Sequence, residues 1–107
     1  MKIYNIGRDA LSKNELEYLD KEVYEYLIYN YHHEEYEGKG TAVLKDKNGK
    51  FILIGLGHCS CYGPLEERTP KCIYSLEEIV KLLDKRCQDV YRSEYIKDIA
   101  KKIKELE

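Results

Sequence analysis

The sequence predicts an α+β fold in which a three- to four-stranded antiparallel meander sheet packs against two C-terminal helices as two layers. Short runs of branched and aromatic residues, separated by glycine-containing turns, occupy the first half of the chain and are typical of antiparallel strands. Apolar residues at helical spacing, each run preceded by a polar start, occupy the second half. At 107 residues and 43% hydrophobic, the chain is long enough for a modest core, so we expect residues 1–107 to form a single domain.

The N-terminal elements follow in chain order. Residues 2–6 form a short strand, and Ser12 followed by Glu15 is a capping box that opens a brief helix ending near Leu19. Residues 22–32 favour a strand, because aromatic and branched residues dominate there. A helix continuing from Ser12 through this segment is the alternative, since it also places several leucines on one face.

The next two strands are predicted as a hairpin. Asn48-Gly49 lies between the apolar runs 41–44 and 51–56, and Asn-Gly between two such runs is the strongest short hairpin signal. Together with the strand at 22–32, these runs form an antiparallel meander of three strands. The third strand leads directly into residues 57–64.

Two helices are predicted in the second half of the chain. Ser75 and Glu78 form a second capping box, which opens an amphipathic helix ending near Cys87. A last helix begins near Ser93. Its apolar stripe consists of Tyr95, Ile96, Ile99, Ile103 and Leu106. Both helices are expected to cover the same face of the sheet, which gives the two-layer arrangement.

The charge distribution argues against some classes of function. The chain is 36% charged with a net charge of −2, which does not suggest nucleic-acid binding. Residues 1–37 carry nine acids and four bases, whereas residues 38–56 carry one acid and four bases, so the N-terminal third is the acidic part. No apolar run approaches the roughly 20 residues that span a bilayer, and no signal-peptide hydrophobic region follows Met1. We therefore expect an intracellular protein.

Residues 57–64, with the sequence GHCSCYGP, hold two thiols, an imidazole and a turn. Cys59 and Cys61 lie on one face of an extended segment because strand side chains alternate, so both can bind one soft metal ion. Cys72 and Cys87 bring the cysteines to four, the number that closes a tetrahedral structural zinc site. In a reducing compartment, cysteines favour roles other than disulfides. The sequence thus predicts a structural Zn2+ that staples the fold through Cys59, Cys61, Cys72 and Cys87.

Alternatives to this ligand set stay open. Cys87 lies about 18 Å from the helix start at about 1.5 Å per residue, so His58 is a reserve fourth ligand. If His58 is not a ligand, we expect its ring to bond to backbone carbonyls. If Cys87 is not a ligand, we expect it to be a small buried apolar residue. A further alternative is that the four cysteines are unrelated thiols that bind no metal, because their spacing is not that of a double C-x-x-C ribbon.

The same segment allows a catalytic interpretation. Cys59 beside His58 suggests a thiol or metal-dependent enzyme centred on residues 58–61, but working Cys–His pairs usually come from distant parts of the chain. The sequence contains no oxyanion-hole motif, phosphate loop or dinucleotide fingerprint. The HHEE run at residues 32–35 has the residue types of a divalent-ion site, or of a solvated polar loop. We predict no catalytic residues.

The choice of aromatic residues is the second unusual feature. The chain has eleven tyrosines, one phenylalanine and no tryptophan, and six of the tyrosines fall between residues 18 and 36 among acidic residues. Tyrosine supplies a large contact area with a polar tip, so this segment predicts a protein-binding surface that attracts a basic partner. The alternative is that alternate tyrosines cover the sheet, with some facing the core. The predicted contacts are Tyr24, Glu25, Tyr26, Tyr29, Tyr31, Glu34, Glu35 and Tyr36.

A resemblance to known proteins rests on the run from Tyr29 to Glu66. It comprises an aromatic and acidic strand, the sequence YEGKGTA at residues 36–42, and the sequence GHCSCYGPLE at residues 57–66. This run resembles small proteins of phages and other mobile elements in low-GC bacteria, and the chain looks like a type II-A anti-CRISPR with a structural zinc. The resemblance covers about a third of the chain and leaves Cys72 and Cys87 outside it.

The resemblance implies a non-enzymatic inhibitor. Such proteins bind an RNA-guided CRISPR nuclease directly and block target-DNA loading or cleavage, with acidic surface placed against the basic DNA-handling surfaces of the nuclease. It therefore implies a host nuclease as protein partner, no direct binding to nucleic acid or membrane, and a location in the cytoplasm of a bacterial host. A small zinc-binding phage module with another binding role is the alternative.

Overall fold

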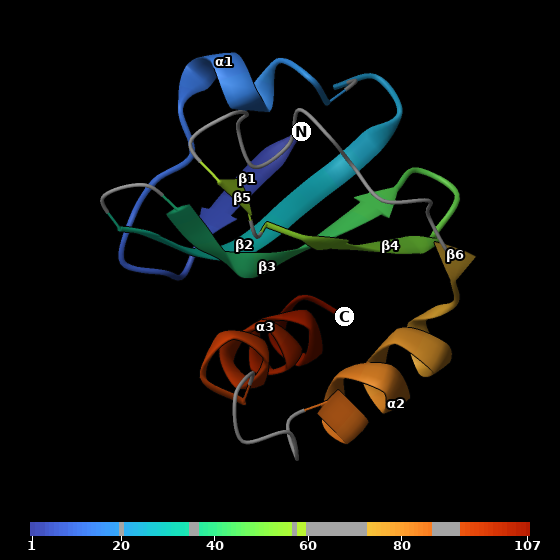
Figure 1. The fold of residues 1–107 in the computed structure, drawn as a ribbon. Helices are drawn as coiled ribbons and strands as arrows, with labels where there is room; N and C mark the ends of the chain where they lie inside the picture. Colours follow the sequence, from blue (N-terminus) through green and yellow to red (C-terminus); the bar gives the residue numbers. More distant parts are fainter. Residues whose placement is uncertain (20, 35–36, 57, 60–72, 87–92) are drawn as a thin grey trace.

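A mixed β-sheet runs through the middle of the molecule and has helices on both sides (Figure 1). The computed structural model describes residues 1–19, 21–34, 37–56, 58–59, 73–86 and 93–107. In chain order its elements are β1 (Lys2–Asn5), α1 (Lys13–Leu16), β2 (Tyr24–Glu34), β3 (Glu37–Asp46), β4 (Phe51–Gly55), β5 (His58–Cys59), β6 (Ile73–Tyr74), α2 (Leu76–Arg86) and α3 (Ser93–Leu106). The predicted α+β class is confirmed. In this described part of the chain, every helix is too short or too polar to cross a bilayer.

The strand order corrects the predicted purely antiparallel sheet. β2, β3 and β4 form the predicted antiparallel meander. β1, however, pairs in parallel with β2, and the order is β1-β2-β3-β4-β6 with β5 beside β3. Parallel pairing requires a connection of about a dozen residues or more. The segment between Asn5 and Tyr24 provides it, because it carries α1 across the face of the sheet opposite α2 and α3 (Figure 1).

The ambiguous segment at residues 22–32 is a strand, as favoured from the sequence. β2 is 11 residues long and lies between β1 and β3, so it forms backbone pairs along both edges. Its register with β3 shifts between Tyr24 and Tyr26. This irregularity turns the two side chains to opposite faces, because Tyr24 belongs to the core on the α1 side and Tyr26 to the core under α2 and α3.

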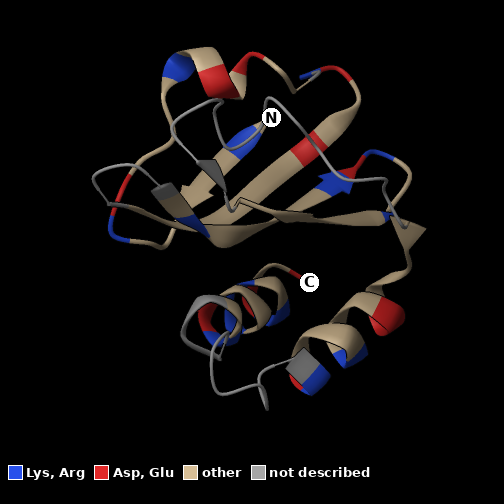
Figure 2. Ribbon diagram, in the orientation of Figure 1, with Lys and Arg blue, Asp and Glu red and all other residues tan. Residues whose placement is uncertain are grey.

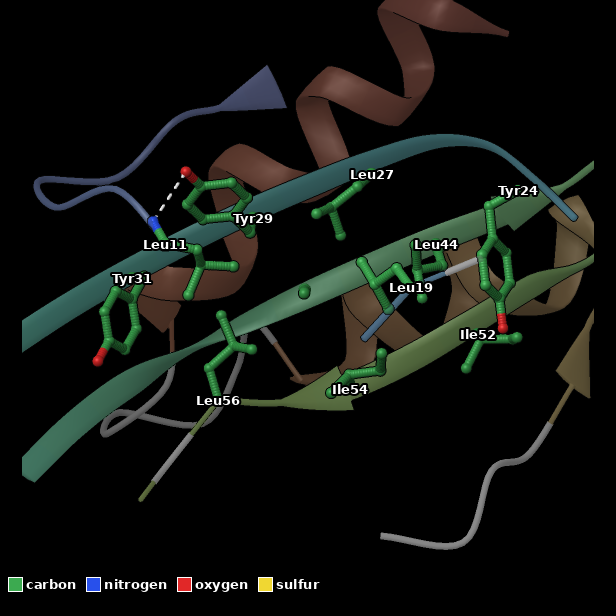
Figure 3. Close-up of a cluster of buried hydrophobic side chains, with 11 residues drawn as sticks. Leu11, Leu19, Tyr24, Leu27, Tyr29, Tyr31, Leu44, Ile52, Ile54 and Leu56 are labelled. Carbon is green, nitrogen blue, oxygen red and sulfur yellow. Dashed lines mark hydrogen bonds between the residues drawn. The ribbon is translucent and has the colours of Figure 1, made fainter. Parts of the chain in front are cut away.

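The first core lies on the face that the N-terminal connection covers (Figure 3). Leu11 and Leu19, which flank α1, are buried against side chains of β2, β3 and β4. The backbone N–H of Leu11 donates to the hydroxyl of Tyr29 at 3.1 Å, which satisfies a buried donor of the connection. The members of this cluster are Leu11, Leu19, Tyr24, Leu27, Tyr29, Tyr31, Ala42, Leu44, Ile52, Ile54 and Leu56.

The second core lies on the opposite face, under α2 and α3 (Figure 1). The predicted stripe of the last helix is confirmed at Ile96, Ile99 and Ile103, which are buried, while Leu106 is half-buried and the side chain of Tyr95 lies outside the described residues. Both helices cover one face, as predicted, but the two-layer prediction omitted the N-terminal connection on the other face. The buried members of the second cluster are Tyr26, Ile28, Val43, Phe51, Ile79, Leu83, Ile96, Ile99, Ala100 and Ile103.

Hydrogen bonds form at both predicted capping boxes, and those of the second box are reciprocal. The backbone N–H of Glu15 donates to Ser12 Oγ at 3.2 Å. Ser75 and Glu78 bond reciprocally, each backbone N–H donating to the other side chain at 3.2 Å, and this bonding holds the pKa of Glu78 below its usual value. α1 ends at Leu16 rather than near Leu19, because the N–H groups of Tyr18 and Leu19 bond three residues back and tighten the final turn.

A partly buried ion pair joins the end of α3 to the sheet. Lys45 Nζ lies 2.7 Å from Glu107 Oε1 and 3.6 Å from Glu25 Oε2, and its hydrogen bond to Glu107 raises the pKa of Lys45. The same ammonium lies 5.6 Å from the centroid of the Tyr26 ring. The Tyr26 hydroxyl donates to Glu107 Oε2 at 3.4 Å, and burial, with the neighbouring Glu107 carboxylate, raises the pKa of Tyr26. The four side chains thus hold one another at the boundary between core and solvent.

Substitution of Gly40 should be costly. A Cβ on Gly40 would collide with the carbonyl oxygen of Asn30 across the β2–β3 hairpin and lie 2.9 Å from Tyr31 Cα. We expect Gly40→Ala to lower the free energy of unfolding by about 2 kcal/mol or more in urea denaturation. Gly55→Ala is the matched control, because a Cβ there meets nothing within 4 Å. Equal losses in the two variants would contradict this close approach.

The burial of Tyr26 predicts a loss of stability at alkaline pH. Its raised pKa keeps the proton on the folded protein above pH 10, where the unfolded chain releases it. The folded state then binds more protons, so stability falls as pH rises, by at most about 1.4 kcal/mol per pH unit for this group. The raised pKa of Lys45 acts in the same direction.

Tyr26→Phe removes only the tyrosine contribution. We expect it to flatten the decline of melting temperature from about pH 10 upwards, with Tyr18→Phe as an exposed control that leaves the slope unchanged. A slope identical in the parent protein and Tyr26→Phe would contradict the assignment.

Candidate functional site

The four tyrosines of β2 that were predicted as partner contacts are core residues. Tyr24, Tyr26, Tyr29 and Tyr31 are 8%, 5%, 2% and 5% exposed. The structure therefore supports the alternative, in which tyrosines cover the sheet and face its cores, and corrects the predicted contact role of these four side chains. The physical reason is that β2 is an interior strand whose two faces are both covered.

Exposed acids and two exposed apolar side chains follow one another along the chain where α1 leads into β2. Glu17, Glu22 and Glu25 are exposed, and between them Tyr18 is 49% exposed and Val23 is 48% exposed. We call these five residues the α1–β2 surface. Figure 2 shows acidic segments along this connection and on β2. Lys21 is the single base between residues 17 and 25, so the segment keeps a negative balance.

This surface overlaps the predicted contacts only at Glu25. The side chain of Glu34 and the residues Glu35 and Tyr36 lie outside the described part of the chain. Val23 was missed, and Tyr18 was counted in the acidic tyrosine segment but not among the predicted contacts, because sequence periodicity does not separate exposed aromatic residues from buried ones. The sequence offered one signal of their exposure, which is that both residues lie in the connection between the capping box and the strand.

The cysteine segment is described only at its start. The backbone of His58–Cys59 forms β5 and pairs antiparallel with the first two residues of β3. Residues 58 and 59 are thus extended, whereas Ser60 and Cys61, on which the assignment of both thiols to one face depends, lie outside the described residues. The remaining predicted ligands lie outside the described residues, namely the side chains of His58 and Cys59 and the whole of Cys61, Cys72 and Cys87.

The strands on either side of the cysteine segment attach to different parts of the sheet. Cys59 pairs with Glu37, whereas Ile73, the residue after Cys72, is level with Leu44 of β3 across β4. Glu37 and Leu44 are seven residues apart, which is about 23 Å of extended strand. A zinc ion shared by Cys59 and Cys72 would have to connect these two positions, so Cys72 is the ligand that most needs an experimental test.

The HHEE run at residues 32–35 is partly described. His32 is half-buried and His33 is exposed. The backbone N–H of His33 donates to Asp9 Oδ2 at 2.8 Å, and this bond lowers the pKa of Asp9. Within the described ranges, no group of three or more His, Cys, Asp and Glu side chains is placed to hold a metal ion.

Comparison of the chain with protein-family models, curated proteins and solved structures gives no match.

Proposed function

We propose that the chain is a non-enzymatic inhibitor that binds a type II-A RNA-guided CRISPR nuclease and blocks target-DNA loading or cleavage. The observation that carries the proposal is the resemblance of the GHCSCYGPLE sequence at residues 57–66 to small proteins of phages and mobile elements. The acidic balance of the N-terminal third supports it, because nucleases present basic surfaces to DNA.

The α1–β2 surface is the part of the described chain that best suits such a partner. Glu17, Glu22 and Glu25 would attract a basic surface during encounter, which acts mainly on the association rate. Tyr18 and Val23 provide exposed apolar area between these acids, and aromatic anchors inside a polar rim carry much of the energy of protein interfaces. Within this set, Glu25 lies 3.6 Å from Lys45, which also pairs with Glu107 at the end of α3, whereas Glu17 and Tyr18 lie on the connection that follows α1.

The proposal includes a structural zinc ion held by Cys59 and Cys61, with Cys72 and Cys87 completing the site and His58 as the reserve ligand. Four thiolates leave no coordination position for water, so such a site stabilises the fold without catalysing a reaction. It would attach residues 57–64, which include β5, to the segments that lead to α2 and follow it.

Inhibition can be measured directly. The purified protein, mixed in slight excess with a guide-loaded type II-A nuclease, should reduce the fraction of target DNA that is cleaved. Reversal of all three acids of the α1–β2 surface, by Glu17→Lys, Glu22→Lys and Glu25→Lys, should slow association by about tenfold at low salt. Tyr18→Ala should mainly speed dissociation.

The matched control reverses three exposed acids on the helices, by Glu77→Lys, Asp84→Lys and Glu105→Lys, and gives the same change in net charge. If both triple variants lose association rate equally, the contact lies elsewhere on the chain. If the parent protein neither binds nor inhibits type II-A nucleases, the proposed function is wrong.

Metal content tests the zinc site separately. Elemental mass spectrometry of the untagged protein should find one zinc per chain, and Cys59→Ser should lose the metal and lower the melting temperature together. The double variant Cys72→Ser, Cys87→Ser should also lose zinc if the four-cysteine set is right. Retention of zinc in that variant would show that Cys72 and Cys87 are not the remaining ligands, and His58 would then be the first candidate. A parent protein without zinc would rule out the site.

A further inference from the structure

The chain after β1 bulges where it runs beside β2. The backbone N–H of Ile6 donates to the carbonyl of Tyr29 at 2.9 Å, and that of Asp9 donates to the carbonyl of Tyr31 at 3.0 Å. Between these two hydrogen bonds the chain advances by three residues, from Ile6 to Asp9, whereas β2 advances by two, from Tyr29 to Tyr31. The chain after β1 therefore has one extra residue at Gly7 and Arg8. Such bulges redirect side chains and are frequent beside binding sites.

Glycine is required at this bulge. A Cβ on Gly7 would lie 2.5 Å from the backbone nitrogen of Tyr31 and 2.6 Å from Asn30 Oδ1. The backbone N–H of Gly7 donates to Asn5 Oδ1 at 3.0 Å, which holds the bend in place. Because the bulge lies directly against β2, it brings the side chain of Arg8 next to those of the β2 residues that follow Tyr29.

A cavity of about 370 Å³ opens between this bulge, β2 and α3. This volume is within the range of small-ligand sites, roughly 300–1,000 Å³. Its described lining comprises Ile6, Gly7, Arg8, Asn30, His32, Lys97 and Asp98. Nitrogen-bearing side chains therefore reach the cavity from three separate elements, with Arg8 from the bulge, His32 from β2 and Lys97 from α3. Asn30, which is 5% exposed, adds a buried amide.

The arginine is held in a defined position. Its Nε donates to Asp9 Oδ2 at 3.1 Å, and its Nη2 donates to the carbonyl of His33 at 3.0 Å. A guanidinium fixed in this way is suited to planar oxygen pairs, because less side-chain entropy is lost when a ligand binds. Lys97 and Asp98 are exposed on the opposite wall, where the lysine attracts an anion and the aspartate repels it.

We propose that this cavity binds a small ligand through an oxyanion group, a carboxylate or a phosphate, held between Arg8 and Lys97 with His32 as a further donor. Arg8 and Lys97 face the Asp98 carboxylate, and Asp9 pairs with Arg8 at 3.1 Å, so an anion is favoured by the convergence of N–H donors from three elements and not by the net charge. The site is independent of the proposed nuclease inhibition, because none of its described residues belongs to the α1–β2 surface.

The test is a titration of the 15N-labelled protein with sodium phosphate and, separately, with sodium acetate, each at constant ionic strength maintained with sodium chloride. Saturable shifts of the Gly7, Arg8, His32 and Lys97 amides are expected with at least one of the two. A response to phosphate alone assigns a phosphate-bearing ligand, and a response to acetate alone assigns a carboxylate. No saturable shift with either anion would overturn the proposal.

Three variants locate the anion. Lys97→Gln should weaken binding about fivefold, whereas Lys101→Gln, an exposed lysine one turn further along α3 and outside the cavity lining, should leave it unchanged. Asp98→Asn should tighten binding, because it removes the repelling charge. If Lys97→Gln and Lys101→Gln weaken anion binding equally, the effect is one of general charge. If Asp98→Asn weakens anion binding, the anion lies elsewhere. Either result would overturn the assigned site.

Discussion

The burial of β2 on both faces is the constraint on which the rest of the structure depends. β2 lies inside the sheet, and every residue from Tyr26 to Tyr31 is buried, including the polar Asn30. Each fully buried large apolar side chain contributes about 1.5–3 kcal/mol, so a strand of this kind is stable only if both of its faces are covered. The N-terminal connection covers one face and α2 with α3 covers the other, which explains why the chain crosses the sheet before β2 begins.

The tyrosines attach these covering layers to the strand. The hydroxyl of Tyr29 accepts a hydrogen bond from Leu11 in the N-terminal connection, while that of Tyr26 donates to Glu107 at the end of α3. A tyrosine ring fills core volume and its hydroxyl satisfies a polar group at the core boundary. The high tyrosine content is thus explained in part by core packing, and the exposed acids beside Tyr18 become the stronger candidates for partner contacts.

Irregular backbone marks both regions of the sheet for which a binding role is proposed. The register shift at Tyr24 and Tyr26 lies beside the α1–β2 surface, at the start of β2. The bulge at Gly7 and Arg8 lies beside the oxyanion cavity, towards the other end of the same strand. Where regular pairing is interrupted, side chains can be redirected without disturbing the core, so binding residues can change while the interior of β2 stays packed.

Local patterns in the sequence determined most of the elements, because a capping box such as Ser75 with Glu78, or a turn such as Asn48-Gly49, acts through neighbouring residues. Tertiary structure decided the parallel partner of β1, the second covered face and the burial of the β2 tyrosines, since each depends on contacts between distant segments. The sequence alone determined that Cys59 and Cys61 have the spacing of paired ligands. Only the fold brought Arg8 and Lys97, far apart in the chain, to one cavity, because a bulge beside β2 and a helix over the same strand meet there.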